Sequence, residues 1–185
     1  MIVILSGVTG VGKSYLKKLI IERLNFKNII VITTRNKRYN EIDSVDKYFL
    51  TDEDFENKKK RKEISVPFEF LGNKYAYYTK DLIMEDVNGI TELHYNTIDE
   101  FRKVAKNVIA IYLKPIQLDE AKEQLKLRGL PKETEEKRLR EIEEQALEFE
   151  NIKEIQKKFD YIIYNDYTEK TVEKIIKLIQ DSLSV

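Results

Sequence analysis

The chain has 185 residues, of which 42% are apolar, and this composition suits one domain with a packed core rather than a disordered chain. Basic and acidic residues number 33 each, and this zero net charge argues against a general binder of nucleic acids or anionic membranes. Cysteine is absent, which excludes disulfides, thiolate metal sites and cysteine nucleophiles. No window approaches roughly eighteen apolar residues, and the first apolar run is too short for a signal peptide. We therefore expect a cytoplasmic chain without membrane or nucleic-acid partners.

Short apolar runs that are typical of buried strands alternate with helical patterns along the chain. Strands are predicted at residues 2–5, 28–33, 90–93, 108–113 and 161–164. Helices are predicted at residues 14–24, from Thr51 onward, after a cap at Asn96 or Thr97, and at 118–127, 133–158 and 172–183. This alternation predicts an α/β fold of three layers, in which helices cover both faces of a mainly parallel five-stranded sheet.

Residues 36–80 interrupt the alternation of strands and helices. Within them, Gly72-Asn73 predicts a tight hairpin between strands at 68–71 and 74–78. Because the chain has no internal repeat and no linker rich in Pro, Gly or Ser, we expect this segment to be a small insert over one end of the sheet, within a single domain.

Residues 7–14 fit the phosphate-binding pattern G-x-x-x-x-G-K-[ST] at every fixed position, between a predicted strand and a predicted helix. Glycines allow the backbone N–H groups of such a loop to converge on a polyphosphate, and the helix N-terminus adds partial positive charge. In this pattern Lys13 reaches the β and γ phosphates, and the Ser14 hydroxyl is placed to bind Mg²⁺. The loop therefore predicts binding of a nucleoside triphosphate.

Several classes of protein share this loop. A GTPase needs an Asn-Lys-x-Asp motif, which is absent, and Asp86-Val87-Asn88-Gly89 precedes a predicted strand instead of following one. An apolar strand that ends in an aspartate is also missing, which disfavours motor and transporter ATPases. Kinases of small molecules remain, in which a second substrate lies opposite the loop and a mobile lid closes over the phosphates.

Arg35 and Arg38 lie three residues apart in a polar loop, and their forked guanidinium groups suit a phosphate monoester. The alternative is a solvated loop with a structural ion pair to Glu41 or Asp43. Tyr75 is placed either to donate its hydroxyl to the same phosphate or to pack across the hairpin.

Thr33-Thr34-Arg35-Asn36-Lys37-Arg38-Tyr39-Asn40-Glu41, followed by Asp46 and Phe49, resembles the guanylate kinase signature T-T-R-x-x-R-x-x-E with its downstream D-x-x-F. Gly72-Asn73-Lys74-Tyr75 is similar to the G-N-x-Y hairpin of that family. Arg128 and Arg138 are similar to its two lid arginines, with Arg140 as a neighbouring candidate for the second. Residues 159–166 resemble its final strand and Asn-Asp turn. These matches occur in family order over nearly the whole chain.

The resemblance implies one domain over residues 1–185 with three parts. They are a core at 1–34, 81–127 and 145–185, an insert that binds the acceptor nucleotide at 35–80, and a helical lid at about 128–144. It implies a P-loop nucleoside monophosphate kinase that uses ATP and Mg²⁺, most simply for the reaction of GMP with ATP to give GDP and ADP. The partners would be small-molecule nucleotides, and the chain would act as a monomer or a homodimer.

The resemblance also assigns roles to single residues. Lys13, Arg128 and Arg138 would be catalytic. ATP would lie on Gly7, Val8, Thr9, Gly10, Val11, Gly12, Lys13, Ser14 and Asn165, with Mg²⁺ on Ser14. The acceptor nucleotide would lie on Arg35, Arg38, Glu41, Tyr75 and Glu92. Glu41 takes the position of a guanine-reading carboxylate, with Asp43 as a competing candidate for that role, and Glu92 keeps a carboxylate that could hold Mg²⁺-bound water.

The departures from the family pattern concern the acceptor. Lys47 replaces a phosphate-binding tyrosine, Val66 and Tyr77 replace an acidic residue and a Ser or Thr, and His94 replaces an aspartate that faces the base. Three possibilities therefore stay open: a GMP kinase with a remodelled pocket, a kinase of another nucleotide or of a ribosyl phosphate, and a non-catalytic binding module.

The basic run at 58–62 follows acidic residues on one predicted helix, so we interpret it as the basic end of that helix.

Overall fold

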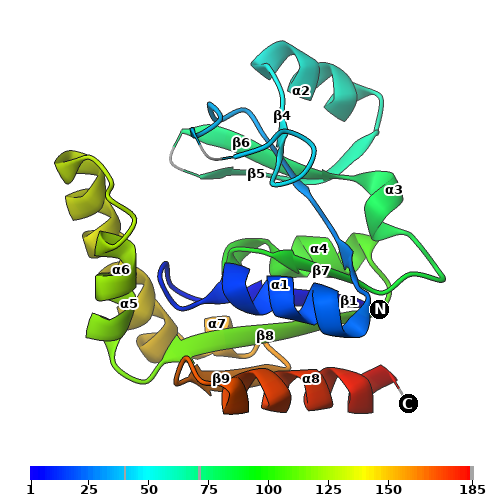
Figure 1. Ribbon diagram of the computed structural model, residues 1–185. Coiled ribbons are helices and arrows are strands. Elements are labelled where there is room, and N and C mark those ends of the chain that lie inside the picture. Colours follow the sequence, from blue (N-terminus) through cyan, green and yellow to red (C-terminus); the bar gives the residue numbers. More distant parts are fainter. Residues whose placement is uncertain (40, 71, 184–185) are drawn as a thin grey trace.

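The computed structural model of the chain describes residues 1–39, 41–70 and 72–183 (Figure 1). Asn40 of the arginine signature, Leu71 at the end of a predicted hairpin strand and the final two residues of the predicted domain lie outside the described residues. No helix in the described part of the chain is both long enough and apolar enough to cross a membrane.

A parallel five-stranded sheet forms the centre of the fold, as predicted. Its strand order is β2-β7-β1-β8-β9. The strands are β1 (Ile2–Ser6), β2 (Lys27–Asn28), β7 (Gly89–Glu92), β8 (Val108–Pro115) and β9 (Tyr161–Asn165). Leu5 of β1 lies opposite Glu92 of β7, so the phosphate-binding loop after β1 and the end of β7 meet at the carboxyl edge of the sheet.

A second, smaller sheet lies above the central one in Figure 1. Its strand order is β4-β3-β6-β5, where β3 is Val31–Thr33, β4 Tyr48–Phe49, β5 Ile64–Phe70 and β6 Asn73–Tyr78. β5 and β6 form the predicted hairpin and pair antiparallel. The strand at β4 was not predicted.

The single strand predicted at 28–33 is wrong, because the chain leaves the central sheet after Asn28 and enters the second sheet at Val31. Ile29 packs in the core beneath the second sheet, whereas Ile32 packs in the core above it. Because both cores require apolar side chains, the apolar run within 28–33 is continuous, and its sequence does not show where the chain passes from one sheet to the other.

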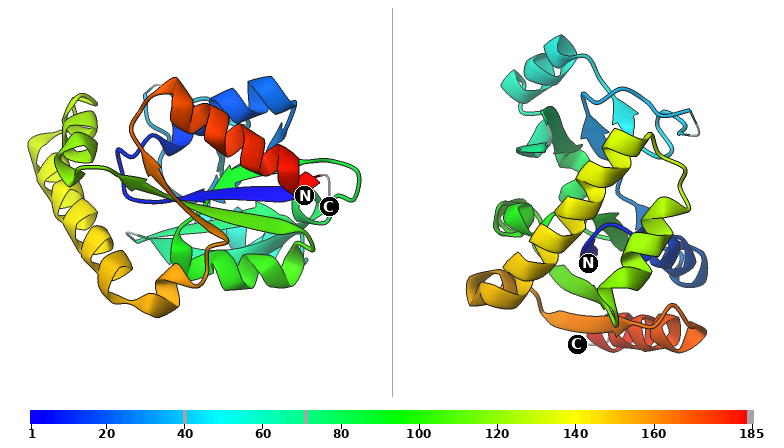
Figure 2. Two further views of the ribbon diagram at one scale, coloured as in Figure 1. Left: turned by 90° about the horizontal axis from the view of Figure 1, so that it is seen from below. Right: turned by 90° about the vertical axis from the view of Figure 1, so that its left-hand side faces the viewer.

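Helices cover both faces of the central sheet (Figure 2). α1 (Lys13–Leu24) and α8 (Glu169–Leu183) contribute Leu16, Ile20 and Ile175 to the core on one face. α4 (Ile98–Val104), which follows the short helix η1 (Tyr95–Thr97), and α7 (Lys153–Gln156) contribute to the core on the other. These layers confirm the three-layer α/β fold.

Two further helices stand at the end of the sheet where the phosphate-binding loop lies (Figure 1). They are α5 (Leu118–Lys126) and α6 (Lys132–Asn151), and the left-handed Gly129 lies between them with a φ of 61°. α2 (Asp52–Lys60) packs on the second sheet and begins after its Thr51 cap, as predicted. Its first turn is acidic and its last turn is basic. α3 (Thr79–Leu82) follows β6.

The single helix predicted at 133–158 is interrupted, since α6 ends at Asn151, Ile152 has an extended backbone with φ −107° and ψ 96°, and α7 begins at Lys153. The Gln156 amide donates to the Phe149 carbonyl oxygen at 2.7 Å and so satisfies a carbonyl that the break leaves free. The break allows Phe149, Ile155 and Phe159 to pack in one cluster with Tyr112.

Candidate active site

The loop between β1 and α1 is built on glycines that have no room for a side chain. Gly7, Gly10 and Gly12 have φ values of 138°, 86° and 88°. A Cβ atom on Gly7 would lie 2.3 Å from the Leu113 carbonyl oxygen, and one on Gly10 would lie 2.0 Å from the Ala121 carbonyl oxygen. The loop therefore lies directly against β8 and α5, and its shape depends on glycine at these positions.

Lys13 begins α1 and folds back over the loop. Its ammonium group donates to the carbonyl oxygens of Gly7 and Val8, both at 2.8 Å. Burial lowers the pKa of Lys13 to about 8; the Glu92 carboxylate opposes this shift and the Arg128 guanidinium adds to it. Arg128, one of the two predicted lid arginines, therefore lies near enough to Lys13 for its charge to act on it.

Ser14, Lys17 and Glu92 form a charged group beside the loop. Glu92 ends β7, and its carboxylate accepts a hydrogen bond from the Ser14 hydroxyl at 3.1 Å. The same carboxylate forms an ion pair with the Lys17 ammonium group, also at 3.1 Å. Burial raises the pKa of Glu92, but Lys17, Lys13 and the hydrogen bonds outweigh it, so the net shift is downward and the carboxylate stays ionised. Ser14 and Glu92 thus supply two oxygen ligands of the kind that Mg²⁺ prefers.

Asn165 supports the loop from behind. It is 3% exposed, and its side-chain amide donates to the Val11 carbonyl oxygen at 2.8 Å while its oxygen accepts from the Tyr167 N–H at 3.0 Å. The Tyr167 hydroxyl donates to the Gly10 carbonyl oxygen at 3.3 Å. Both polar groups of Asn165 are engaged within the protein, so the structure places it as a support of the loop backbone.

Arg35, Arg38 and Glu41 form a compact arrangement after β3. One Glu41 carboxylate oxygen pairs with the Arg35 guanidinium at 2.7 Å, and the other accepts from the Arg38 backbone N–H at 2.9 Å. Arg35 also lies over the Phe49 ring, with its Cζ 5.5 Å from the centroid. Glu41 therefore shapes the loop that carries both arginines.

Tyr75 and Tyr77 lie on β6 but have different surroundings. Tyr75 is half-buried and its ring stacks on Phe68 of β5, with centroids 5.1 Å apart. Tyr77 is fully buried, and its hydroxyl donates to the Glu92 carbonyl oxygen at 3.1 Å. Val66 is also buried and has a φ of 55°, an unusual conformation for a β-branched residue, at a register shift of the β5–β6 pair.

Positive charges from separate parts of the chain converge on Arg38. Partial burial lowers the pKa of Arg38, and the charges of Arg35, Arg138 and Arg128 lower it further, whereas the Glu41 carboxylate opposes the shift. Arg138 itself, on α6, pairs with Glu141 at 2.9 Å and lies over the Phe70 ring, whereas Arg140 faces the cavity described below. Arg35, Arg128 and Arg138 therefore lie near enough to Arg38 for their charges to act on it.

Sequence reasoning missed two lysines of this field. Lys17 pairs with Glu92, and its place four residues after Lys13, one turn along the same face of α1, was a usable signal. Lys47 had been identified only as a departure from the family pattern. Burial lowers the pKa of Lys47, Glu92 raises it, and the charges of Lys17 and Arg35 lower it.

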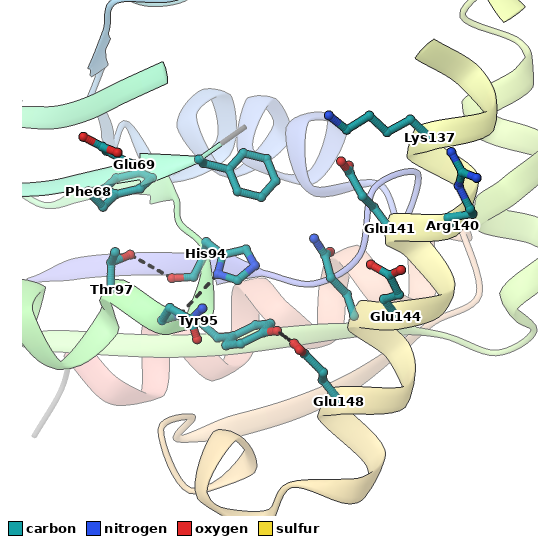
Figure 3. Close-up of a pocket in the computed structure, with 13 residues that line it drawn as sticks. Phe68, Glu69, His94, Tyr95, Thr97, Lys137, Arg140, Glu141, Glu144 and Glu148 are labelled. Carbon is teal, nitrogen blue, oxygen red and sulfur yellow. Dashed lines mark hydrogen bonds between the residues drawn. The ribbon is translucent and has the colours of Figure 1, made fainter. Parts of the chain in front are cut away.

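His94, the single histidine of the sequence, follows β7 and lines a cavity (Figure 3). Its Nδ1 accepts from the Asn96 N–H at 3.4 Å, so His94 caps η1; Thr97, one of the two predicted caps, takes the N-cap position of α4, although its side chain makes no capping hydrogen bond. Its ring contacts Tyr95, with centroids 4.1 Å apart, and lies 5.7 Å from that of Phe70. Burial lowers the pKa of His94 to about 4; Glu148 opposes this shift and Lys13 adds to it.

The tight loop predicts unequal effects of two glycine substitutions. Gly10→Ala should reduce stability and nucleotide binding, because its Cβ must displace the α5 backbone. Gly72→Ala is the matched control, since its φ of 72° is also positive but, chain neighbours aside, no atom of the described residues lies within 4 Å of its Cβ; it should cost only about 1 kcal/mol. Urea unfolding with ATP titration measures both. Equal losses in the two variants would contradict the close packing of the loop.

The His94 environment predicts a loss of stability in acid. The pKa in the folded chain is about 4, below the ordinary value of 6.5, so the unfolded chain binds more protons between these values. The contribution of His94 is fully present above pH 6.5 and is lost as the pH falls towards 4. Because the histidine is single, one NMR titration reports its pKa, and His94→Asn should remove this part of the acid loss. A midpoint near 6.5 would show that His94 is solvated.

Comparisons with known proteins agree with this geometry. A comparison with protein-family models matches residues 1–182 to the family described as Guanylate kinase. A guanylate kinase from Anaplasma phagocytophilum is similar in structure over 98% of this chain and 85% of its own, with 22% sequence identity and a TM-score of 0.72. An uncharacterized protein from Eubacterium ventriosum is similar over 100% and 98%, with 12% identity and a TM-score of 0.53. At these identities the solved structures show a shared fold, and the family match shows more: the chain belongs to the guanylate kinase family and is a phosphotransferase of the nucleoside monophosphate kinase type.

Proposed function

We propose that the chain transfers the γ-phosphoryl group of ATP to the phosphate of GMP, giving ADP and GDP. The observation that carries this proposal is the convergence of positive charge on one site. Lys13 follows β1, Arg35 and Arg38 follow β3, and Arg128 and Arg138 flank the start of α6. Arg128 acts on Lys13 and on Arg38, so donor loop, acceptor loop and lid share one electrostatic field. Such a field suits two phosphorylated substrates in contact.

The donor side is the loop at residues 7–14. Its glycines leave the backbone N–H groups open to a polyphosphate, and α1 directs its N-terminus at the same place. The Lys13 ammonium group would bind the β and γ phosphates. Ser14 and Glu92 would hold Mg²⁺, which neutralises charge on those phosphates when it is bound. We assign Glu92 to this side because it contacts Ser14 and Lys17, and Asn165 to the support of the loop.

The acceptor side is the arginine loop together with Tyr75. Arg35 and Arg38 would bind the acceptor phosphate by charge-assisted hydrogen bonds, and the Tyr75 hydroxyl would add a neutral donor. Glu41 has both oxygens engaged with Arg35 and Arg38, so we assign it the positioning of this loop. The cost of holding two like charges close together is lowest when a dianionic phosphate lies between them.

The reaction needs no covalent enzyme intermediate. An oxygen of the acceptor phosphate attacks the γ phosphorus in line, and the bond from that phosphorus to the β–γ bridging oxygen breaks, which releases ADP. Lys13, Arg128 and Arg138 stabilise the charge that spreads over the transferred group. We propose that residues 128–144 form a lid over residues 35–80, and that closure excludes the water that would otherwise hydrolyse ATP.

A kinase of another phosphate acceptor is the second candidate function. It is favoured by the buried Val66 and Tyr77, which present no carboxylate and no free hydroxyl at the positions where the family resemblance places base-reading groups. A non-catalytic binding module is the third. It would bind nucleotides without forming ADP.

The proposal is tested by measuring ADP formation from ATP·Mg²⁺ in the presence of each of several acceptors: GMP, dGMP, AMP, CMP, UMP, dTMP and ribose 1,5-bisphosphate. Lys13→Ala should lower turnover by about 100- to 1000-fold, as expected when a group that stabilises the transition state is removed. The fold should persist, because the hydrogen bonds of the Lys13 ammonium group within the described part of the chain go to the loop that it covers. Lys18→Ala, on the exposed side of α1, is the control and should keep full turnover.

Stimulation by GMP alone would support the GMP kinase, and stimulation by another member would move the specificity but keep the phosphoryl transfer. Unaltered turnover of Lys13→Ala would contradict the role of the loop. ATP binding without stimulation by any acceptor would contradict the kinase and leave the binding module.

A further inference from the structure

A cavity of about 600 Å³ lies between β5, the segment after β7 and α6 (Figure 3). Its phosphate-proximal wall is aromatic, because Phe68 stacks on Tyr75 and Phe70 lies under the Arg138 guanidinium. The cavity therefore begins next to the groups that we assign to the acceptor phosphate. Its size and this flat aromatic wall suit the base of a bound nucleotide.

The opposite wall of the cavity is a row of polar side chains on α6. Glu141, Gln145 and Glu148 follow each other at intervals of four and three residues, so they lie on one face of the helix. The Glu148 carboxylate accepts a hydrogen bond from the Tyr95 hydroxyl. Glu144, which also borders the cavity, is exposed to solvent.

Glu141 differs from these neighbours in its hydrogen bonding. Its side chain is only 13% exposed, and its Oε2 atom accepts from the Arg138 guanidinium at 2.9 Å. Its Oε1 atom is buried and has no hydrogen-bond partner among the residues that the structure describes. In Figure 3 the Glu141 side chain projects from α6 towards the cavity. A buried carboxylate oxygen without a partner costs free energy, and a ligand with N–H donors removes that cost.

The donors and acceptors around Glu141 match one base best. Guanine presents N1–H and a 2-amino group side by side, which suits a carboxylate, and it presents O6 as an acceptor beside them. The Gln145 amide, one turn from Glu141, can donate to such an oxygen. His94 adds a second donor: its Nδ1 accepts from Asn96, so the neutral ring carries its proton on Nε2.

We propose that Glu141 recognises the guanine of the acceptor nucleotide through its N1–H and 2-amino groups, so that base reading lies on α6 and not on the β5–β6 hairpin. This inference rests on the proposed function and deepens it. It gives the pocket a base-reading carboxylate although Val66 and Tyr77 offer none. It also joins two tasks in one residue, since Glu141 holds Arg138 as well.

The test compares the wild-type chain with Glu141→Gln, and with Glu136→Gln as a control on the exposed side of the same helix. For each chain, kcat and KM are measured with GMP, with IMP, which lacks the 2-amino group, and with AMP, which lacks both donors of that edge. Calorimetry measures the binding of GMP alone.

Glu141→Gln should lower kcat/KM for GMP by about 10- to 100-fold, the range for a lost hydrogen bond to a charged group, mainly through KM. The loss should be smaller with IMP and least with AMP. GMP binding should weaken similarly, and Glu136→Gln should match the wild type. An equal loss with all three acceptors would show that Glu141 only positions Arg138, and would overturn the inference while the kinase stands.

Failure of the proposed function has a different signature. If the wild-type chain forms no ADP with any acceptor, the kinase is refuted, and calorimetry still decides the inference. GMP binding that Glu141→Gln weakens would then support base reading by Glu141. Absence of GMP binding by the wild-type chain would overturn it.

Discussion

The site depends on the pairing of a few carboxylates with a larger number of cations. Glu92 holds Ser14 and Lys17 beside the phosphate loop, Glu41 holds Arg35 in the acceptor loop, and Glu141 holds Arg138 on α6. Each carboxylate organises one part of the site, and positive charge remains in excess. Because like charges repel across a partly buried site, bound phosphates stabilise the arrangement, and this requirement links the fold to phosphoryl transfer.

Much of the fold follows from local sequence patterns, and the exceptions have a common cause. The parallel sheet and the loop at residues 7–14 were predictable, because apolar runs and glycine positions are local signals. The division of 28–33 between two sheets was not, since Ile29 and Ile32 look alike in sequence and pack in different cores. The end of α6 at Asn151 could not be predicted either, because the helical spacing of apolar residues continues through Ile155 although the helical backbone is interrupted at Ile152.

The candidate site divides in the same way. Lys13, Arg35 and Arg38 could be singled out from motifs, and the charge of Arg128, a predicted lid arginine, acts on both Lys13 and Arg38. Glu141 could not, because its significance rests on an unpaired oxygen in a cavity, and that is a property of three-dimensional packing. Glu41 was found as a residue, but its hydrogen bonds to Arg35 and Arg38 indicate a structural task that the motif did not reveal.

The central claim is that donor and acceptor phosphates occupy one continuous cationic site. The most direct measurement is the affinity for a bisubstrate analogue in which adenosine and guanosine are joined by five phosphates, compared with ATP and GMP separately. Because linkage makes the second binding event intramolecular, the account predicts that the analogue binds at least about 100-fold more tightly than either nucleotide. An analogue that binds no more tightly than ATP would contradict the account, since the two phosphate sites would then not face each other.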